Sequence, residues 1–207
     1  CIKTAHKTAN VPYNTISYIE AHGTGTKLGD PVEIEALNKS FNYDTSHKCA
    51  IGSIKSNAGH LGNAAGIIGL LKTTLSIKNK MIPASLHFKN PNPEINFDNG
   101  PFYVNTILKK WEQINNSPLR AGVSSFGIGG TNVHVILEEY EKIEKQSNQR
   151  PFQLIAYSAK TKSSLNNYTE KLKDFINAET FDLADLAYTL KTGRADFSYK
   201  NFIVCQD

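Results

Sequence analysis

Cysteine is scarce in this chain, and the three that occur form no pattern. Cys1, Cys49 and Cys205 are odd in number, far apart and outside any Cys-x-x-Cys spacing. Their arrangement excludes a dense disulfide framework and a cysteine-based metal centre, and no other set of metal ligands is expected. We therefore expect free thiols and a reducing, cytoplasmic location.

Long hydrophobic runs and concentrated charge are lacking as well. The longest apolar stretch, LGNAAGIIGLL at residues 61–71, stops at Lys72 and is too short to span a bilayer. The formal charge of +4 comes from 23 basic and 19 acidic residues that are scattered along the chain. Because nucleic acids and membrane surfaces are bound by concentrated basic faces, neither partner is expected.

The chain also lacks a signal peptide and an initiator methionine, since it opens on CIKTAHKTAN. We therefore expect it to be part of a longer protein. Its 207 residues, 40% of them hydrophobic, suffice for one large domain or two small ones. The polar stretch EKIEKQSNQRP at 141–151 predicts a boundary between a domain at 1–140 and a second at 141–207.

Strands and helices alternate in the first domain, which indicates an α/β fold. Strands are predicted at 15–21 and 49–57. After the first strand, Asp30 is expected to be the N-cap of a helix to about residue 41, with Pro31 at the first helical position and Glu33 closing a capping box.

A second helix, predicted at 61–77, is apolar or small on nearly every side, which favours burial between two layers. The rest of the first domain is expected to hold a proline-rich covering loop at 81–101, a short strand within 102–111, and two strands joined by a glycine turn at 120–140. Beyond the boundary we expect a small α/β unit. Its elements are a strand at 152–159, helices at 162–178 and 182–193, and a final strand at 201–205.

Three turns between these elements place polar groups beside glycine. They are HGTGT, which begins at His22, KSNAGH, which runs from Lys55 to His60, and FGIGGTN at residues 126–132. Ligands usually bind at strand-to-helix turns of α/β sheets. Taken singly each turn is weak evidence, because a lone histidine is more often a cap and GIGG can be a hairpin without a ligand. The other histidines, which lack such a context, are assigned structural roles: His6, His47, His87 and His134.

Taken together, the turns and their flanks resemble the β-ketoacyl synthases, in particular the ketosynthase domains of polyketide synthases. The matching stretches are EAHGTGTKLGDPVEIEAL, GSIKSNAGHLGNAAGIIGLLKT, NPNPEINF and RAGVSSFGIGGTNVHVILEE. Their order fits the C-terminal half of that domain over residues 1 to about 140. The segments 154–176 and 182–204 are similar to the linker that leads from a ketosynthase toward an acyltransferase, here truncated.

The resemblance implies a thiolase-like fold of five alternating helix and sheet layers, of which this chain supplies the C-terminal half. It also implies decarboxylative condensation of an acyl thioester with a malonyl-type extender, which requires a cysteine nucleophile and two histidines. His22 and His60 match those histidines, and Lys55 matches the lysine of the same loop. Glu33 occupies the position of the acid that usually pairs with the lysine, so it has two competing interpretations, ion pair and capping box.

The glycine turn of the family supplies a backbone amide to the oxyanion hole, and here that amide belongs to Ile128. Thr24 and Thr26 resemble the residues that bind the phosphopantetheine arm of an acyl carrier protein, so no cofactor is expected to bind the chain directly. Further substrate-binding residues are expected in the glycine turn: Phe126, Gly129 and Asn132.

The family nucleophile lies in a TACSS-like turn, and none of the three cysteines matches it. The resemblance therefore implies three partners: the N-terminal half of the ketosynthase, which carries this cysteine, the acyl carrier protein, and a second copy in a homodimer. Alone, the chain is expected to expose an apolar face and to be unstable and inactive. Two alternatives stay open, a non-catalytic scaffold and a thiolase that acts on coenzyme A thioesters. The two intact histidines disfavour both.

Overall fold

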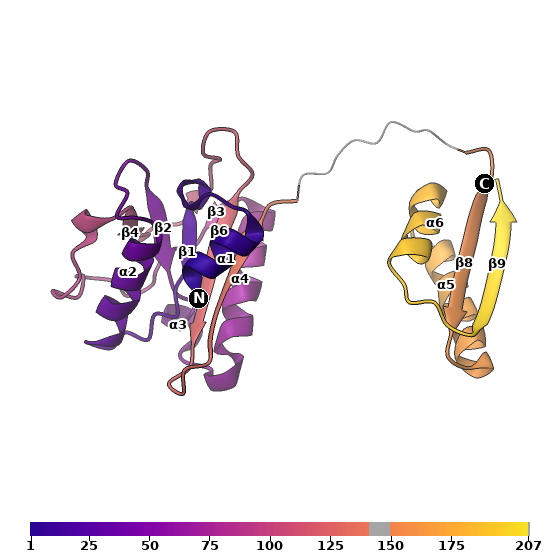
Figure 1. Cartoon of the computed structure of the whole chain (residues 1–207), viewed down its shortest axis with the longest axis horizontal. Helices are drawn as coiled ribbons and strands as arrows, with labels where there is room; N and C mark the ends of the chain where they lie inside the picture. Colours follow the sequence, from indigo (N-terminus) through magenta and orange to yellow (C-terminus); the bar gives the residue numbers. More distant parts are fainter. Residues whose placement is uncertain (141–149, 207) are drawn as a thin grey trace. The chain divides into compact units, whose positions relative to one another are not determined.

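The computed structural model describes residues 1–140 and 150–206. They form two compact units, one within Cys1–Lys142 and one within Ile143–Asp207 (Figure 1). Nearly all of the predicted boundary segment, residues 141–151, lies outside the described residues. The domain boundary therefore stays a prediction.

A five-stranded sheet forms the centre of the first unit, in the order β4-β2-β1-β6-β7. Four neighbouring strands are parallel, and β7 closes the sheet as an antiparallel hairpin with β6. The parallel strands therefore end at the same edge, where ligands of α/β sheets usually bind. The strands are β1 (Tyr18–Glu20), β2 (Cys49–Gly52), β4 (Phe102–Val104), β6 (Arg120–Phe126) and β7 (Asn132–Glu138).

Helices cover both faces of this sheet (Figure 1). Helices α1 (Ile2–Ala9) and α2 (Gly29–Ser40) pack on one face, and α4 (Ala65–Asn79) packs on the other. The smaller elements are a single helical turn, α3 (Lys55–Ala58), an antiparallel pair of two-residue strands, β3 (Met81–Ile82) and β5 (Lys109–Lys110), and 3-10 turns at Tyr13–Thr15, Gly62–Ala64 and Phe97–Asn99.

The alternation of side chains along β1 divides the interior into two cores. Ile19 packs with Leu37 of α2 on one side of the sheet. Tyr18 packs with Ile77 of α4 and with Trp111 on the other. Because successive strand residues point to opposite faces, Glu20 lies on the same side as Tyr18, beneath α4.

Helix α2 begins at Gly29, two residues earlier than the start at Pro31 that the capping pattern predicts. The Gly29 amide donates to Thr26 Oγ1 at 3.0 Å, and Asp30 instead accepts the Gly25 amide at 3.0 Å. The predicted N-cap at Asp30 with Pro31 at the first helical position is therefore wrong. The HGTGT turn folds back onto the helix start and supplies its own acceptor.

Helix α4 differs from its prediction in how much of it is covered. Its sheet-facing side is tight, because a Cβ on Gly69 would lie 3.2 Å from Glu20 Cγ. The opposite side carries Ile67, Leu71 and Leu75, which are 55%, 51% and 55% exposed. The predicted burial between two layers is thus found on one side only, because within the described residues a single sheet packs against the helix.

The remaining predictions are largely confirmed. The two strands at 120–140 are β6 and β7, whereas the strand predicted at 49–57 ends at Gly52 and gives way to α3. The second unit is an antiparallel pair with two helices, β8 (Gln153–Ala159), α5 (Lys162–Ala178), α6 (Leu183–Thr192) and β9 (Tyr199–Cys205). No helix in residues 1–140 or 150–206 has both the length and the apolar character needed to cross a bilayer.

The exposed side of α4 predicts that the purified chain self-associates. We expect the double substitution Leu71→Glu and Leu75→Glu to increase the monomeric fraction, since each leucine buried in a contact contributes about 2 kcal/mol. Size-exclusion chromatography with light scattering measures this fraction. The control is Ile107→Glu, an apolar residue outside the helix that is 66% exposed, and a wild-type chain that is already monomeric would contradict the prediction.

Candidate active site

Three segments carrying the predicted site residues meet at the carboxyl edge of the sheet. His22 lies two residues beyond β1, Lys55 three residues beyond β2, and Phe126 is the last residue of β6. Because β1 pairs in parallel with both β2 and β6, these residues emerge side by side. The sheet topology therefore brings together motifs that are 33 to 104 residues apart in sequence, as counted from His22.

The two predicted histidines lie against each other. The ring centroids of His22 and His60 are 5.7 Å apart, and the rings are nearly perpendicular at 88°. The Phe126 ring lies 5.9 Å from the His22 ring, on a third segment. Two imidazoles and one phenyl ring, from three separate segments, thus lie within 6 Å of the His22 ring or belong to it.

The Glu33 carboxylate holds the backbone of the HGTGT turn. Its Oε1 accepts the amide of His22 at 2.8 Å, and its Oε2 accepts the amide of Gly23 at 2.9 Å. Glu33 is only 7% exposed. Burial raises the pKa of this carboxyl, and the two amides oppose that rise. The carboxylate therefore fixes the point at which the chain leaves β1.

Lys55 holds the same peptide from the other side, because its ammonium group donates to the carbonyl oxygen of His22. Among the described residues, neither of the two interpretations of Glu33 is found: it forms no direct ion pair with Lys55, and it does not close a capping box. Glu33 instead accepts the amide of His22, and Lys55 donates to the His22 carbonyl oxygen. Burial lowers the pKa of Lys55, while Glu33, Glu20 and Asp30 oppose that change.

The environment of His22 favours its neutral form. Burial lowers its pKa from the usual 6.5, and the nearby charges of Lys55 and His60 act in the same direction. Gly23 follows with a φ of +49°, and a Cβ there would lie 2.8 Å from Ser53 Cβ. Only glycine meets both demands, so the sequence of the turn is set by the close approach of β1 and the segment after β2.

His60 lies after α3 and is exposed at the edge of the site. Its Nδ1 accepts the amide of Gly62 at 3.0 Å. In a neutral imidazole this assigns the proton to Nε2, which is then a hydrogen-bond donor. Within residues 1–140 and 150–206 no side chain forms a hydrogen bond with His60, so the backbone of this turn presents it as a donor.

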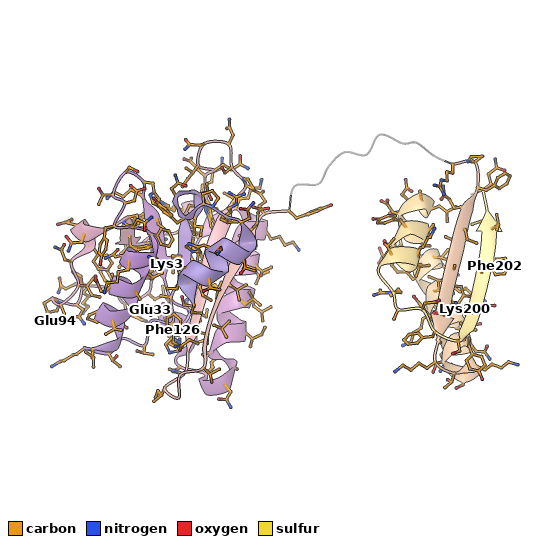
Figure 2. The ribbon with its side chains drawn as sticks, viewed as in Figure 1. Lys3, Glu33, Glu94, Phe126, Lys200 and Phe202 are labelled. Carbon is orange, nitrogen blue, oxygen red and sulfur yellow. The ribbon has the colours of Figure 1, made fainter. Side chains whose placement is uncertain are left out.

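A cavity of about 960 Å³ opens beside these groups. Figure 2 labels three of its lining residues, Lys3 on α1, Glu33 on α2 and Phe126 at the end of β6. The exposed thiol of Cys1 also lines it. The other predicted site residues that line this cavity are His22, Thr24, Thr26, Ile128 and Asn132, whereas Lys55 lines a second cavity of about 560 Å³ and His60 and Gly129 line neither.

Some polar groups of the two threonines and of the glycine turn already form hydrogen bonds within the fold. Thr26 Oγ1 accepts the Gly29 amide, and Thr24 Oγ1 lies 3.2 Å from Thr26 Oγ1. The glycine turn is closed by the Gly127 amide, which donates to the Thr131 carbonyl at 2.9 Å. Ile128 is fully exposed at this turn. The Thr26 hydroxyl is therefore partly committed to the fold.

Sequence reasoning missed three residues beneath the site, Glu20, Lys72 and Tyr18. They form a buried cluster in which Lys72 Nζ lies 2.7 Å from Glu20 Oε2. A lysine in an otherwise apolar helix and a glutamate in a buried strand were the signals that could have found them. The histidines assigned to structure include His134, which bonds Ser124 Oγ at 2.9 Å in the core and whose pKa burial lowers to about 4.

Comparison with known families matches nearly the whole chain. Residues 1–89 match the model of the beta-ketoacyl synthase C-terminal domain, and residues 91–204 match the model of the ketoacyl-synthetase C-terminal extension. The second model covers more than half of the chain and begins inside the first structural unit.

Curated relatives include polyketide synthase PksL of Bacillus subtilis, 45% identical over 94% of this chain and 4% of its own length. A second is polyketide synthase ThaG of Burkholderia thailandensis, 40% identical over 93% of this chain and 4% of its own length. The chain thus spans a small part of these relatives.

Solved structures of ketosynthases are also similar. The ketosynthase from module 6 of the bacillaene synthase of Bacillus subtilis has a TM-score of 0.65 at 42% identity, over 99% of this chain and 35% of that one. The oxazolomycin ketosynthase domain OzmH KS7 of Streptomyces albus has a TM-score of 0.66 at 35% identity, over 98% and 37%. These likenesses confirm the predicted resemblance and the thiolase-like α/β fold class.

The bidentate role of Glu33 predicts a specific effect of Glu33→Gln. Glutamine has one carbonyl oxygen, so one of the two amides loses its acceptor and faces an NH₂ group, at a cost of about 1–3 kcal/mol in unfolding free energy. Hydrogen exchange should become faster at residues 22 and 23, together with a lower urea midpoint. Glu35→Gln on the exposed side of α2 is the control, and equal effects of the two substitutions would contradict the clamp.

Proposed function

We propose, because this chain belongs to the β-ketoacyl synthase family, that it supplies the C-terminal half of a polyketide synthase ketosynthase. The complete domain would act as an acyltransferase that condenses an acyl thioester with a malonyl-type extender. The observation that carries the proposal is the pair of imidazoles, His22 and His60, whose ring centroids are 5.7 Å apart and of which His22 lines an open cavity.

Once the cysteine carries the acyl group, the reaction has two charge-bearing stages, decarboxylation and condensation. The acyl group is first transferred from its carrier thioester to the cysteine nucleophile of the N-terminal half, and the carrier thiolate leaves and takes up the cysteine proton. The bond between the extender's α-carbon and its carboxylate then breaks, carbon dioxide leaves, and the electron pair forms an enolate. The enolate carbon attacks the acyl thioester carbon, and the cysteine thiolate leaves. Both stages place negative charge on a carbonyl oxygen, which hydrogen-bond donors stabilise.

We assign both histidines as hydrogen-bond donors to the enolate oxygen. His60 offers Nε2–H because its Nδ1 already accepts the Gly62 amide. Burial and the charge of Lys55 lower the pKa of His22 and so favour its neutral form, in which it can donate from one nitrogen without carrying a full charge. We assign the amide of Ile128 to the tetrahedral oxyanion of the second stage, since this residue lines the same cavity as His22.

The other residues bind the substrate or hold the histidines. Lys55 and Glu33 fix the His22 peptide. Thr24 and Thr26, which line the cavity, are assigned to the phosphopantetheine arm of the carrier protein. Further contacts to the acyl chain are assigned to the glycine turn: Phe126, Gly129 and Asn132.

The proposed partners follow from the same assignment. They are the acyl carrier protein, the N-terminal half of the ketosynthase with its cysteine, and a second copy of the complete domain in a homodimer, in the cytoplasm. The exposed apolar side of α4 supports a covering layer, because such faces are normally buried. No cofactor other than the carrier-bound phosphopantetheine arm of the substrate is proposed. The chain alone is expected to be inactive.

Co-expression with the N-terminal half tests the proposal. We expect a thioester probe to acylate a cysteine of that half, as read by intact and peptide mass spectrometry, and condensation to fall by about 100-fold or more in His22→Ala and in His60→Ala, which remove one donor each. His87→Asn, at an exposed histidine, is the matched control. Cys1→Ser excludes acylation of the thiol that lines the cavity.

Either of two outcomes would refute this proposal. Full condensation activity in both histidine variants would remove their assigned role. A chain that folds stably alone, gains no activity from the N-terminal half and still binds carrier protein would instead identify a non-catalytic scaffold.

The lowered pKa of His22 predicts the pH dependence of condensation. If activity needs neutral His22, the acidic limb of kcat/KM lies below pH 6.5, the usual value for an imidazole. Lys55→Met removes a positive charge near the ring, which makes protonation easier and raises the His22 pKa. The acidic limb should therefore move to higher pH while the rate falls. A limb that stays in place, or moves to lower pH, would contradict this assignment.

A further inference from the structure

A buried carboxylate lies directly behind the candidate active site. Glu20 is the last residue of β1, two positions before His22, and only 1% of it is exposed. Its Oε1 accepts the amide of Ile54 at 2.5 Å. Ile54 is the residue immediately before Lys55 and α3, so the carboxylate joins the end of β1 to the segment that follows β2.

The second oxygen of Glu20 is paired with a charge from α4. Oε2 lies 2.7 Å from Lys72 Nζ and accepts the Tyr18 hydroxyl at 2.7 Å. Lys72 Nζ also donates to the Tyr18 hydroxyl oxygen at 2.9 Å. The Lys72 side chain is 10% exposed and that of Glu20 is 2% exposed, so this is a nearly enclosed ion pair. Lys72 Nζ also lies 5.6 Å from the centroid of the Tyr18 ring.

Two glycines leave space for this cluster. A Cβ on Gly69 of α4 would lie 3.2 Å from Glu20 Cγ. A Cβ on Gly52 of β2 would lie 3.1 Å from the Tyr18 hydroxyl and 3.7 Å from Lys72 Nζ. Side chains at these positions would press on the ion pair from the helix and from the neighbouring strand. The cluster is therefore built by three elements, β1, β2 and α4.

The cluster connects to both histidines through the main chain. From Glu20, two residues along the chain lead to His22. Through the Ile54 amide it holds the start of α3, and the chain then leads through Lys55 to His60. Lys55 links the two segments a second time by donating to the His22 carbonyl. One carboxylate is thus bonded to both of the segments on which the two imidazoles lie.

We infer that Glu20 is a positioning residue, held by Lys72 and Tyr18, whose bond to the Ile54 amide sets the separation of His22 and His60. The inference rests on the proposed function, because the separation matters when both imidazoles donate to one enolate oxygen. Lys72 supplies the opposite charge and holds the buried carboxylate in place, since a buried charge without a partner is costly. The cluster does not touch the substrate and acts through the two turns.

Two neutral double variants test this role without leaving a buried charge unpaired. Glu20→Gln with Lys72→Met keeps a carbonyl oxygen for the Ile54 amide, and the Tyr18 hydroxyl can accept from the new NH₂ group. Glu20→Ala with Lys72→Met removes the acceptor. The readout is the ratio of condensation rate to acyl-loading rate in the co-expressed domain, because loading of the cysteine does not use the enolate donors. Loss of folded protein lowers both rates together and leaves the ratio unchanged.

The alanine variant is expected to lower this ratio by roughly 10- to 100-fold, the effect of displacing a reacting group by about 1 Å. The glutamine variant should stay within about threefold of the wild-type ratio if it keeps one ordinary hydrogen bond. The matched control is Glu35→Ala with Lys39→Met, which removes an exposed ion pair on α2 and should leave the ratio unchanged.

Tyr18→Phe keeps the test decisive if the alanine variant does not fold, since it removes one hydroxyl and leaves both charges paired. It should lower the ratio about threefold, the effect of one lost hydrogen bond. Equal ratios in the two double variants, or an unchanged ratio in Tyr18→Phe, would overturn the positioning role. If His22→Ala and His60→Ala leave condensation intact, the proposed function itself fails. If they abolish it while the cluster variants do not change the ratio, only the present inference fails.

Discussion

The backbone of residue 22 is held from both sides, and the geometry of the site depends on this. Glu33 accepts the amides of His22 and Gly23, while Lys55 donates to the His22 carbonyl. A strand that ends at the edge of a sheet has unsatisfied peptide groups, which would otherwise bind water and move. Here two charged side chains satisfy them, the buried Glu33 and the half-buried Lys55, so the imidazole leaves the sheet in one direction. The same contacts explain why the next residue is glycine, because the turn passes within reach of Ser53.

Charge is buried on both sides of this turn at a cost that packing must offset. Glu33 lies toward α2, and Glu20 with Lys72 lies toward α4. Taking ions out of water is unfavourable, and a buried ion pair is often no more stable than an apolar replacement. What the buried charges supply is a fixed orientation of the turn, because a carboxylate with two fixed amide donors cannot rotate freely. The half-buried helix α4 supplies the lysine on its sheet side and an open apolar surface on the other.

The sequence indicated which turns meet, but it did not indicate how they are joined. Parallel strands followed by glycine-rich turns predict a shared edge, and His22, Lys55 and Phe126 are found there. The partners of Glu33 depend on a reversal of the chain between residues 23 and 29. Local spacing predicted a capping box instead, and the family resemblance implied an ion pair with Lys55. The Glu20 cluster joins residues 34 and 52 positions away, and no short-range pattern predicts such contacts. Long-range polar contacts are therefore the part that sequence reasoning missed.

The two held turns, in our interpretation, place both imidazoles on one oxygen atom of the substrate. A crystal structure of the complete domain with a non-decarboxylating malonyl thioester analogue would test this most directly. We expect one nitrogen of His22 and Nε2 of His60 both to lie about 3 Å from the thioester oxygen, with the bonds of Glu33 and Lys55 to the His22 peptide intact. An analogue bound through only one imidazole, or a His22 peptide released from Glu33, would contradict it.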